Sequence, residues 1–489
     1  MKSKLLSKSK YLNGLQCLRY LWLLFNEPAK IPAPDASTQH IFDEGHRVGE
    51  LAKRLFPNGI NIPINDFTEN LARTKELIKS CKPLFEPGFF VDDIYSRLDI
   101  LKPVGNDEWD MVEVKGSTSV KDVNVHDVSF QRLCAERFGL KIRKCFIAHI
   151  NNQYVKLGEI EPEKLFTTED ITVAVNDASI GIQGRIDAMF EIISSSECPD
   201  VSIGSHCNQP YACPVASCWE SLPEHHVFQL YRGGRKCSEL FSQGILRVKD
   251  IPKGFKLSEP QRIQKDCVIS GTPHINKIAI KDFLGRLQYP LHYFDFETIS
   301  PMLPIYEGTR PFQRIPFQFS LHLVGQANSK PVHYSFLAEG SDDPRLKLLS
   351  VLKGVFKDSG SVVVYNQSFE KSVLQELGEA FPRFRGFVDD LCGRLVDLYT
   401  PFREFNYYHP IQKGSASIKE VLPAVTGKSY KGMPIANGDD ASLAFLRLVC
   451  DDISDEGRAR LRADLERYCG LDTEGMLLIV DRLRALSSQ

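Results

Sequence analysis

The sequence predicts a mixed α/β protein built from two modules. Short runs of alternating apolar and polar residues, typical of strands, occur between longer runs with apolar residues at three- and four-residue spacing, typical of helices. A length of 489 residues favours two or more domains over one. A cysteine-rich segment, residues 207–218, separates two series of such elements. We therefore expect one module on each side of it.

Composition narrows the class of protein. Charged residues make up 25% and hydrophobic residues 43%, which is ordinary globular usage. Sixty Lys and Arg against 62 Asp and Glu give a net charge of −2, so nucleic-acid binding would need local basic patches. Thirteen cysteines, an odd number, favour reduced thiols or metal ligands over a disulfide scaffold.

The N-terminal stretch predicts an amphipathic helix rather than a targeting segment. Asn13, Gln16 and Arg19 interrupt the apolar core that a signal peptide needs. No run of about 18 apolar residues occurs in the chain, so we expect no membrane span. The expected compartment is the cytoplasm.

The first series of elements begins with helical periodicity over residues 7–55, broken at the prolines of 28–34. Two strand-like runs follow, joined by a turn containing Gly105 and Asn106, and then a helix, a strand and a second hairpin that continues into QYVKLG. In order, these elements are expected at 94–101, 109–115, 128–139, 144–150 and 153–158. The sequence GRID at 184–187 is interpreted as another hairpin, with Asp187 as a structural acid.

The second series begins at Leu291, after a stretch with little periodicity. It predicts three strands, a helix, a strand, a helix and a long final helix, at 291–299, 316–324, 331–338, 346–356, 361–366, 369–381 and about 456–486. We therefore expect three parts: a first module at 1–220, a connecting region at 221–287 and a second module at 288–489.

A first group of charged residues suits metal-dependent chemistry. Glu113 and Lys115 share one face of a strand, and Asp99 lies on the preceding strand of the hairpin. Two carboxylates can hold a divalent cation, which activates water near a phosphate, and a lysine can orient that water. The same pattern alone also fits the solvated face of a strand.

The surrounding segments RLDIL, WDMVEVKGST, DVSFQRL and HINNQYV resemble PD-(D/E)XK nucleases of the RecB type, particularly the CRISPR-associated single-strand exonucleases. The resemblance covers about residues 7–220 and implies a restriction-endonuclease-like fold. It implies metal ligands at His46, Asp99 and Glu113 and catalytic roles for Lys115 and Gln131. One departure is Ala135, which stands where the family often has a tyrosine.

Three cysteines lie close together in a loop with the spacing C-x5-C-x4-C: Cys207, Cys213 and Cys218. Clustered thiols in a reducing compartment suit metal or iron–sulfur ligation. The same resemblance implies a [4Fe–4S] cluster whose fourth ligand is Cys17. A zinc site completed by Cys237 or His206 is the alternative.

A second group of acids lies in the C-terminal series. Asp295 and Glu297 share a strand face, Glu370 begins a helix, and Tyr468 and Asp472 share a helix face at i and i+4. Together they resemble the DEDD exonucleases of the DnaQ type, over about residues 288–486. The resemblance implies a ribonuclease-H-like mixed sheet with flanking helices and two Mg²⁺ or Mn²⁺ ions.

Within that resemblance the acids Asp295, Glu297, Glu370 and Asp472 are the metal ligands, and Tyr468 orients the attacking water. Glu370 stands where the family usually has Asp, and its side chain is one methylene longer. Asp397 is interpreted as a structural acid.

The two resemblances suggest a bacterial family of unknown function that fuses both modules. We expect a metal-dependent nuclease that hydrolyses phosphodiester bonds of single-stranded or frayed nucleic acid, DNA being favoured, with two candidate centres. The second module is expected to act at a 3′ end. The alternative is a nucleic-acid-binding scaffold in which one or both centres are inactive.

Overall fold

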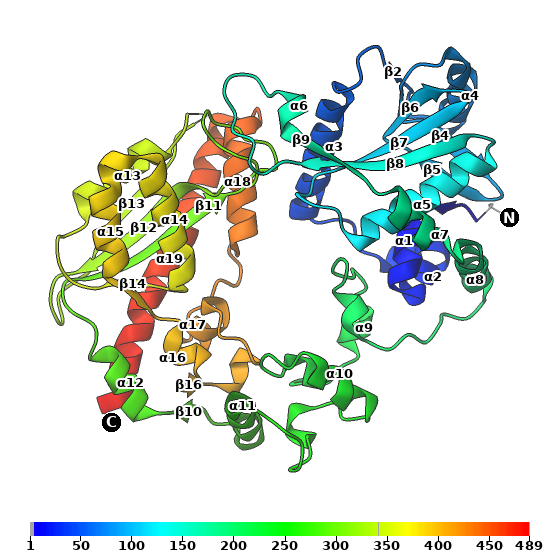
Figure 1. Ribbon diagram of the computed structural model, residues 1–489. Coiled ribbons are helices and arrows are strands. Elements are labelled where there is room, and N and C mark those ends of the chain that lie inside the picture. The colour runs from blue at the N-terminus through cyan, green and yellow to red at the C-terminus, as the bar shows by residue number, and fades with distance from the viewer. Residues whose placement is uncertain (1–3, 341, 489) are drawn as a thin grey trace. The chain divides into compact units, whose positions relative to one another are not determined.

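The computed structural model describes residues 4–340 and 342–488, which form several mixed sheets flanked by helices (Figure 1). The expected mixed α/β class is confirmed. The chain divides into two compact units: unit 1 is Met1–Ser221 with Pro301–Phe312, and unit 2 is Leu222–Ser300 with Gln313–Gln489. The short second segment of unit 1 contributes Leu303 to a core cluster with Val48 and Ala52.

Unit 1 is built around a six-stranded mixed sheet. The central strands β7 and β8 are parallel, and β6 and β9 flank them in the antiparallel direction. The sheet order is β2 (Ile60–Asn61), β3 (Leu84–Phe85), β6 (Ile100–Gly105), β7 (Glu108–Lys115), β8 (Lys141–Ile150) and β9 (Phe166–Asp170). The β6–β7 hairpin turns through Gly105, Asn106 and Asp107, all at positive φ, as the turn residues predict.

The alternation of side chains along β7 separates two cores. Met111 packs in the cluster on one face, and Val112 packs in the cluster on the other. Helix α3 packs on the face of Val112, and α5 and α7 pack on the face of Met111. The helices of unit 1 are α1 (Lys8–Gln16), α2 (Leu18–Asn26), α3 (Ala36–Lys53), α4 (Phe67–Leu77), α5 (Asp122–Arg137), α6 (Pro162–Leu165), α7 (Thr172–Ser179), α8 (Ile182–Ser194) and α9 (Ser217–Glu220).

Three local expectations in unit 1 were wrong. The run at 94–101 is divided into β5 (Ile94–Arg97) and β6, and β5 belongs to a separate small sheet between β1 (Leu6–Ser7) and β4 (Gly88–Val91). QYVKLG forms no strand, and β8 pairs instead with β9. GRID lies in α8, because Ile182, Ile186, Met189 and Ile193 recur at helical spacing and are buried together.

Unit 2 is built around a five-stranded mixed sheet. Strand β12 is antiparallel to both of its neighbours, β11 and β13, whereas β14 and β15 run parallel to β11. The sheet order is β13 (Val332–Leu337), β12 (Ile315–Val324), β11 (Leu291–Ile299), β14 (Val362–Val364) and β15 (Leu395–Asp397). These strands occur where the alternating runs predict them, apart from β15.

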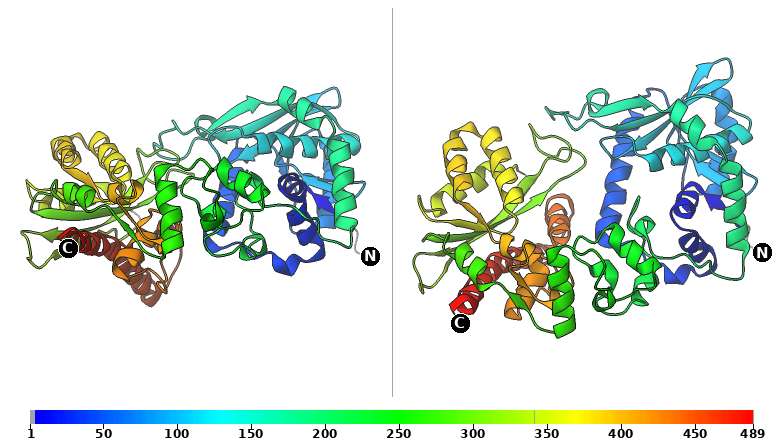
Figure 2. Two further views of the ribbon diagram at one scale, coloured as in Figure 1. Left: turned by 90° about the horizontal axis from the view of Figure 1, so that it is seen from below. Right: turned by 60° about the horizontal axis from the view of Figure 1, so that its bottom comes forward.

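Helices cover this sheet on both faces (Figure 2). Phe294 and Phe296 point into the core beneath one helical layer, so Asp295 and Glu297 point to the other face, where α19 lies. The first layer comprises α13 (Arg345–Val355), α14 (Gln367–Ala380) and α15 (Arg385–Gly393), and the second comprises α18 (Gly438–Cys450) and α19 (Asp455–Ser488).

The remaining elements of unit 2 are short. Residues 222–287, which have little periodic signal, contain helices and a small hydrophobic cluster around Leu230 and Leu240. The elements are α10 (Arg235–Ser242), α11 (Glu259–Ser270), α12 (Lys277–Leu284), α16 (Thr400–Arg403), α17 (Ile418–Thr426) and the pair β10 (His274–Ile275) and β16 (Tyr407–Tyr408).

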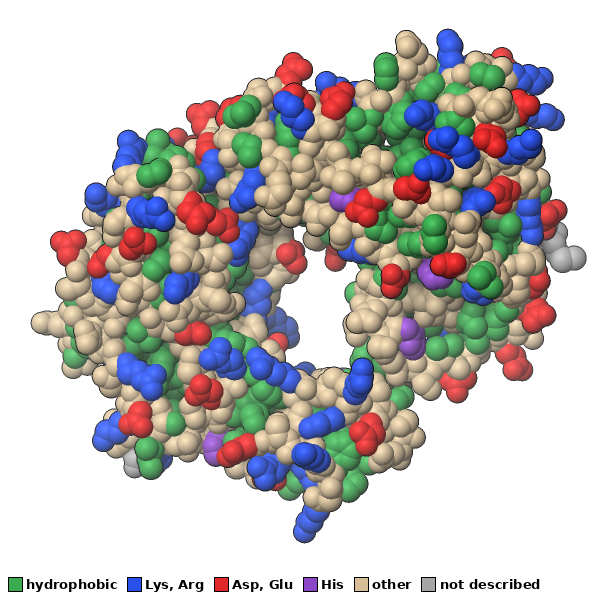
Figure 3. Space-filling model, viewed as in Figure 1, with side chains coloured by type: hydrophobic (Ala, Val, Ile, Leu, Met, Phe, Trp, Pro, Cys, Tyr) green, Lys and Arg blue, Asp and Glu red, His purple; other side chains and the backbone are tan. Residues whose placement is uncertain are grey.

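The surface agrees with the balanced charge of the chain. Acidic and basic side chains are interspersed over the face of each unit that Figure 3 shows. Within the described residues, no helix combines the length and the apolarity that crossing a bilayer requires.

Candidate functional site

The acids predicted in the second module lie together in unit 2. Asp295 and Glu297 project from β11 toward α19, because their neighbours Phe294 and Phe296 fill the core on the opposite face. A register shift follows Glu297 in the pairing of β11 with β12. The two carboxylates therefore occupy adjacent positions near the end of a central strand.

Glu370 reaches the same place from α14. Asn366, with φ 76°, turns the chain between β14 and α14, and Glu370 lies in the first turn of α14. The side chain is only 2% exposed, and its Oε2 has no hydrogen-bond partner. A buried carboxylate oxygen without a partner is costly, and it marks a place where a bound cation would be stabilised.

The last two predicted residues come from the long helix α19. Tyr468 and Asp472 are one turn apart and both buried. The hydroxyl of Tyr430 donates a hydrogen bond of 2.5 Å to Oδ1 of Asp472. All five predicted residues line one cavity of about 490 Å³, together with the cations Lys419 and Arg314.

Burial raises the pKa of every one of these carboxyl groups. It raises the pKa of Glu370 to about 8 and that of Asp472 to about 6. The pKa values of Asp295 and Glu297 lie well above their ordinary range, through burial first and then the negative charge of Asp472. The positive charge of Lys419 lowers the pKa of Glu297 and of Asp472, but by less than burial raises it. The pocket therefore has more negative groups than its own cations neutralise.

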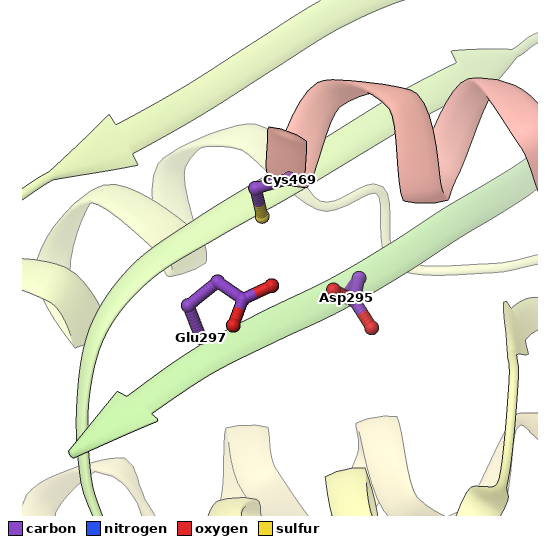
Figure 4. A group of neighbouring side chains, drawn as sticks. All are labelled: Asp295, Glu297 and Cys469. Carbon is purple, nitrogen blue, oxygen red and sulfur yellow. The ribbon is translucent and has the colours of Figure 1, made fainter. Parts of the chain in front are cut away.

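Cys469, which the sequence did not indicate as a site residue, lies beside two of these carboxylates. The sulfur of Cys469 and the carboxylate oxygens of Asp295 and Glu297 lie within 4.8 Å of one another. Figure 4 shows the thiol of α19 pointing toward both carboxylates of β11. Its position next to Tyr468 in the sequence was the available signal. Tyr430 and Lys419 gave none, because they lie outside the motifs.

Asp397 has the structural role expected of it. Its Oδ1 accepts hydrogen bonds from the backbone amides of Asn366, at 3.0 Å, and Tyr399, at 3.1 Å. It thereby stabilises the turn that leads into α14. Its charge also contributes to the raised pKa of Glu370.

Four of the five residues predicted in the first module, all except His46, also converge, in unit 1. Lys115 donates hydrogen bonds of 2.7 Å to Oε1 of Glu113 and to Oδ2 of Asp127. Gln131 donates to the other oxygen of Glu113 at 2.8 Å and to Asp127 at 2.9 Å. Asp99 accepts a hydrogen bond of 2.7 Å from the backbone amide of Val114. The hairpin and α5 thus bring the motif residues into one network.

Two members of this network were missed. Asp127 precedes Gln131 by four residues, so helical spacing could have indicated it. Lys8, on α1, lies 3.0 Å from Oε1 of Glu113, and no local pattern signals that contact. Gln131 keeps its Oε1 buried without a partner.

Charge in this network is more evenly balanced than in unit 2. Burial and the charge of Asp99 raise the pKa of Glu113, which Lys115 and Lys8 oppose. Burial acts in the same direction on Asp127, yet Lys115 and Lys8 hold its pKa below the ordinary value. Lysine ammonium groups therefore already bind the carboxylates that a metal would use.

Two predicted features of the first module stand apart from the network. His46 is exposed on α3, and within the described residues no hydrogen bond or ion pair joins it to Glu113 or Asp99. The nearby acid Glu44 is buried, where it accepts a hydrogen bond from the backbone of Met302. Ala135 is fully buried in the core, so a tyrosine would not fit there without rearrangement.

The four cysteines assigned to a cluster line one small cavity of unit 1. Cys17 lies between α1 and α2, and the other three, Cys207, Cys213 and Cys218, come from the loop that ends in α9. Gln16 holds this loop through hydrogen bonds of 2.8 Å to the carbonyls of His206 and Tyr211. Burial raises the pKa of Cys213 and Cys218.

The spacing of the four thiols bears on the choice of metal. A tetrahedral zinc site with Zn–S near 2.3 Å needs sulfur atoms about 3.8 Å apart. Within the described residues, only Asp295, Glu297 and Cys469 form a group of three or more ligand atoms within 4.8 Å of one another, so no three of the four thiols lie that close together. His206 lines the same cavity, whereas Cys237 is buried in the hydrophobic cluster of unit 2.

Comparison with known proteins places part of unit 2 in a wider group. Residues 292–417 match the family described as "Domain of unknown function (DUF2779)". The matched segment contains Asp295, Glu297 and Glu370 and ends before Tyr468 and Asp472.

Two curated relatives are similar to the chain. They are "Uncharacterized protein MG366 homolog" of Mycoplasma pneumoniae and "Uncharacterized protein MG366" of Mycoplasma genitalium, each 27% identical over 221 and 220 residues respectively. Each alignment covers 41% of this chain and 33% of the relative, so the chain spans about a third of the length of the curated relatives that it matches. These similarities fit a family of unknown function, and none of the names carries an activity.

Proposed function

We propose that the protein is a cytoplasmic, divalent-metal-dependent nuclease that hydrolyses phosphodiester bonds of single-stranded or frayed nucleic acid. The observation that carries this proposal is the cavity of unit 2. In it, four carboxylates from one strand and two helices converge with Tyr468, and one buried oxygen of Glu370 has no partner.

The donor set fits divalent cations. Carboxylate oxygens are the preferred ligands of Mg²⁺ and Mn²⁺. The raised pKa values of the four carboxyl groups mean that their charged forms are disfavoured, so a bound cation would stabilise those charged forms. Asp295, Glu297, Glu370 and Asp472 would hold the ions. A bound pair of cations supplies charge stabilisation for an attacking and a leaving oxygen in phosphodiester hydrolysis.

The remaining residues of the pocket have separate roles in this proposal. Burial and the charge of Asp472 raise the pKa of the Tyr468 phenol, so Tyr468 keeps its proton and can orient a water molecule by hydrogen bonding. Lys419 lies 5.6 Å from the centre of the Tyr468 ring and can neutralise part of a phosphate's charge. Arg314 lines the same cavity while paired with Glu376 at 2.8 Å.

The sheet order of unit 2 supports a ribonuclease-H-like arrangement. Three antiparallel strands are followed by two strands parallel to the first, and Asp295 and Glu297 lie on that first strand. This is the order expected for the DEDD exonucleases that the sequence resembles, and that resemblance implies an exonuclease that acts at a 3′ end.

The network in unit 1 supports a second centre of the PD-(D/E)XK type. Asp99, Glu113, Lys115 and Gln131 lie on the hairpin and helix that such a module would use. The four cysteines Cys17, Cys207, Cys213 and Cys218 line one cavity and would hold a [4Fe–4S] cluster, with a zinc site as the alternative.

The test is cleavage of labelled single-stranded DNA and RNA in Mg²⁺ or Mn²⁺, with either the 5′ or the 3′ end blocked. We expect Asp295→Asn to abolish cleavage that depends on a free 3′ end and Glu113→Gln to abolish any residual activity. Matched controls are Asp451→Asn and Glu136→Gln, which remove exposed acids paired with Arg447 and Arg132.

The alternative is a binding scaffold. It would be preferred if wild-type protein binds single strands but leaves them intact under all of these conditions. For unit 1, the observation that favours a binding scaffold is that Lys8 and Lys115 both contact Oε1 of Glu113, where a metal ion would bind.

A further inference from the structure

Cys469 is a buried thiol beside the carboxylates of Asp295 and Glu297, and the proposed hydrolysis does not use it. The side chain is fully buried on α19, one residue after Tyr468. Its sulfur lies within 4.8 Å of oxygens from both Asp295 and Glu297, and Figure 4 shows all three side chains pointing into the same space.

These distances suit a cation held by all three groups. Metal–oxygen bonds of about 2.1 Å and a metal–sulfur bond of about 2.3 Å keep the oxygen and sulfur atoms at most about 4.4 Å apart. Small side-chain movements are therefore enough to bring the three atoms of this group to ligand distances.

A second observation independently indicates a ligand at this place. Oε2 of Glu370 is buried without a hydrogen-bond partner and belongs to a side chain that lines the same cavity as Asp295 and Glu297. The negative charge of Glu370 also acts on Asp295 directly. A cation bound by Asp295, Glu297 and Cys469 could therefore take Oε2 of Glu370 as a fourth ligand.

The chemistry of the donor set selects the kind of cation. Mg²⁺ prefers oxygen ligands alone, whereas zinc, cadmium and cobalt also bind thiolate sulfur. We propose that the pocket of unit 2 has a second binding mode, in which Cys469 joins Asp295 and Glu297 in binding thiophilic divalent cations such as Zn²⁺ or Cd²⁺. In this mode the S–H bond of Cys469 breaks, its proton passes to solvent, and a sulfur–metal bond forms.

The second mode has a regulatory consequence. Thiophilic cations and Mg²⁺ compete for the same two carboxylates, so zinc displaces the catalytic ions and inhibits cleavage. This consequence rests on the proposed nuclease function, whereas the binding of the cation through Cys469 does not.

The binding is tested on metal-free, full-length protein titrated with CdCl₂. Cadmium NMR separates a site with one sulfur and several oxygens from an all-sulfur site, so the cysteines of unit 1 do not obscure the result. We expect a mixed-ligand resonance in wild type and its loss in Cys469→Ser, with the cadmium affinity of that site at least about tenfold weaker. The affinity for Mg²⁺ should stay within about twofold of wild type.

Three further variants separate ligand loss from loss of structure. Cys469→Ala tests whether the fold tolerates a smaller side chain, with circular dichroism and thermal unfolding as readouts. Cys392→Ser, which changes a half-buried thiol of α15 that is not grouped with Asp295 and Glu297, should retain the mixed-ligand resonance. Asp295→Asn should weaken the binding of both cadmium and magnesium.

The outcomes distinguish this inference from the proposed function. A mixed-ligand resonance that depends on Cys469, in a protein without nuclease activity, supports the metal site and removes the hydrolytic role. Cleavage that depends on Mg²⁺ and Asp295, together with cadmium binding unchanged in Cys469→Ser and Cys469→Ala, overturns the thiol as a ligand while leaving the nuclease intact.

Discussion

The hydroxyl of Tyr430 donates a hydrogen bond of 2.5 Å to Oδ1 of Asp472, and both side chains are buried. This bond holds one oxygen of a carboxylate that is a candidate metal ligand, and it lowers the pKa of Asp472 against the effect of burial. Tyr430 is therefore a positioning residue, because it fixes the direction in which Asp472 presents its other oxygen.

Replacing this phenol should shift the titration of Asp472. Tyr430→Phe removes a hydrogen bond to a charged acceptor, which is worth about 1.5–3 kcal/mol. The pKa of Asp472 should rise above its value of about 6, and the acid limb of any pH–rate profile should move to higher pH. NMR titration of metal-free protein measures the first effect.

The control is Tyr365→Phe. The hydroxyl of Tyr365 also lies at this pocket, but it donates to the carbonyl of Ala416 at 2.5 Å. An equal shift in both variants would show that Tyr430 has no specific effect on Asp472.

The stability of the metal-free protein should depend on pH through Glu370. Its pKa is about 8 in the folded protein, above the ordinary value of a glutamate, so the folded state binds more protons than the unfolded state between about pH 4 and 8. The favourable contribution is therefore complete below about pH 4 and is lost as the pH rises through about 8.

Denaturant unfolding across this range should show the effect. The stability of wild type relative to Glu370→Gln should fall with rising pH, by a few kcal/mol at most. Added Mg²⁺ or Mn²⁺ should recover much of that loss at pH 8 in wild type. A difference that rises with pH would contradict the raised pKa.

Lys8 should stabilise unit 1 through Glu113. Its Nζ lies 3.0 Å from a carboxylate that is 4% exposed, and Lys115 contacts the same oxygen. Lys8→Met removes one of two cations, so the free energy of unfolding should fall by about 1–3 kcal/mol. A double-mutant cycle with Glu113→Gln should give a coupling energy of about 0.5–3 kcal/mol.

The matched control for that cycle is Lys141→Met, which changes an exposed lysine at the start of β8. It should alter stability by less than about 0.5 kcal/mol. Independent effects of Lys8→Met and Glu113→Gln would mean that the contact contributes nothing measurable.

The four cysteines of unit 1 should be required together for metal retention. Cys213→Ser should remove bound iron and its brown colour from an anaerobic preparation, because the loss of one thiolate leaves a [4Fe–4S] cluster incompletely ligated. The control Cys81→Ser changes an exposed thiol of the same unit. A colourless wild-type protein with stoichiometric zinc would contradict the cluster.

Local pattern predicted the secondary structure of the second module closely. Alternation over 291–299 agrees with β11, and three- and four-residue spacing over 456–486 agrees with α19 at Asp455–Ser488. Prediction was poorer where two short elements meet, since Leu98 and Asp99 separate β5 from β6, which belong to different sheets. Short strands have few residues, so alternation alone does not show which sheet they join.

The sequence by itself determined which side chains share a face: Asp295 with Glu297, Tyr468 with Asp472, and Glu113 with Lys115. These pairs depend on the periodicity of one strand or helix, which neighbouring residues encode.

Only the tertiary structure decided which other groups meet them. Tyr430 reaches Asp472 across 42 residues of sequence, Lys8 reaches Glu113 across 105, and Cys469 approaches Asp295 from another element. Such contacts depend on how sheets and helices pack and on where burial removes carboxylates from water. The periodicity of one strand or helix predicts neither this packing nor this burial.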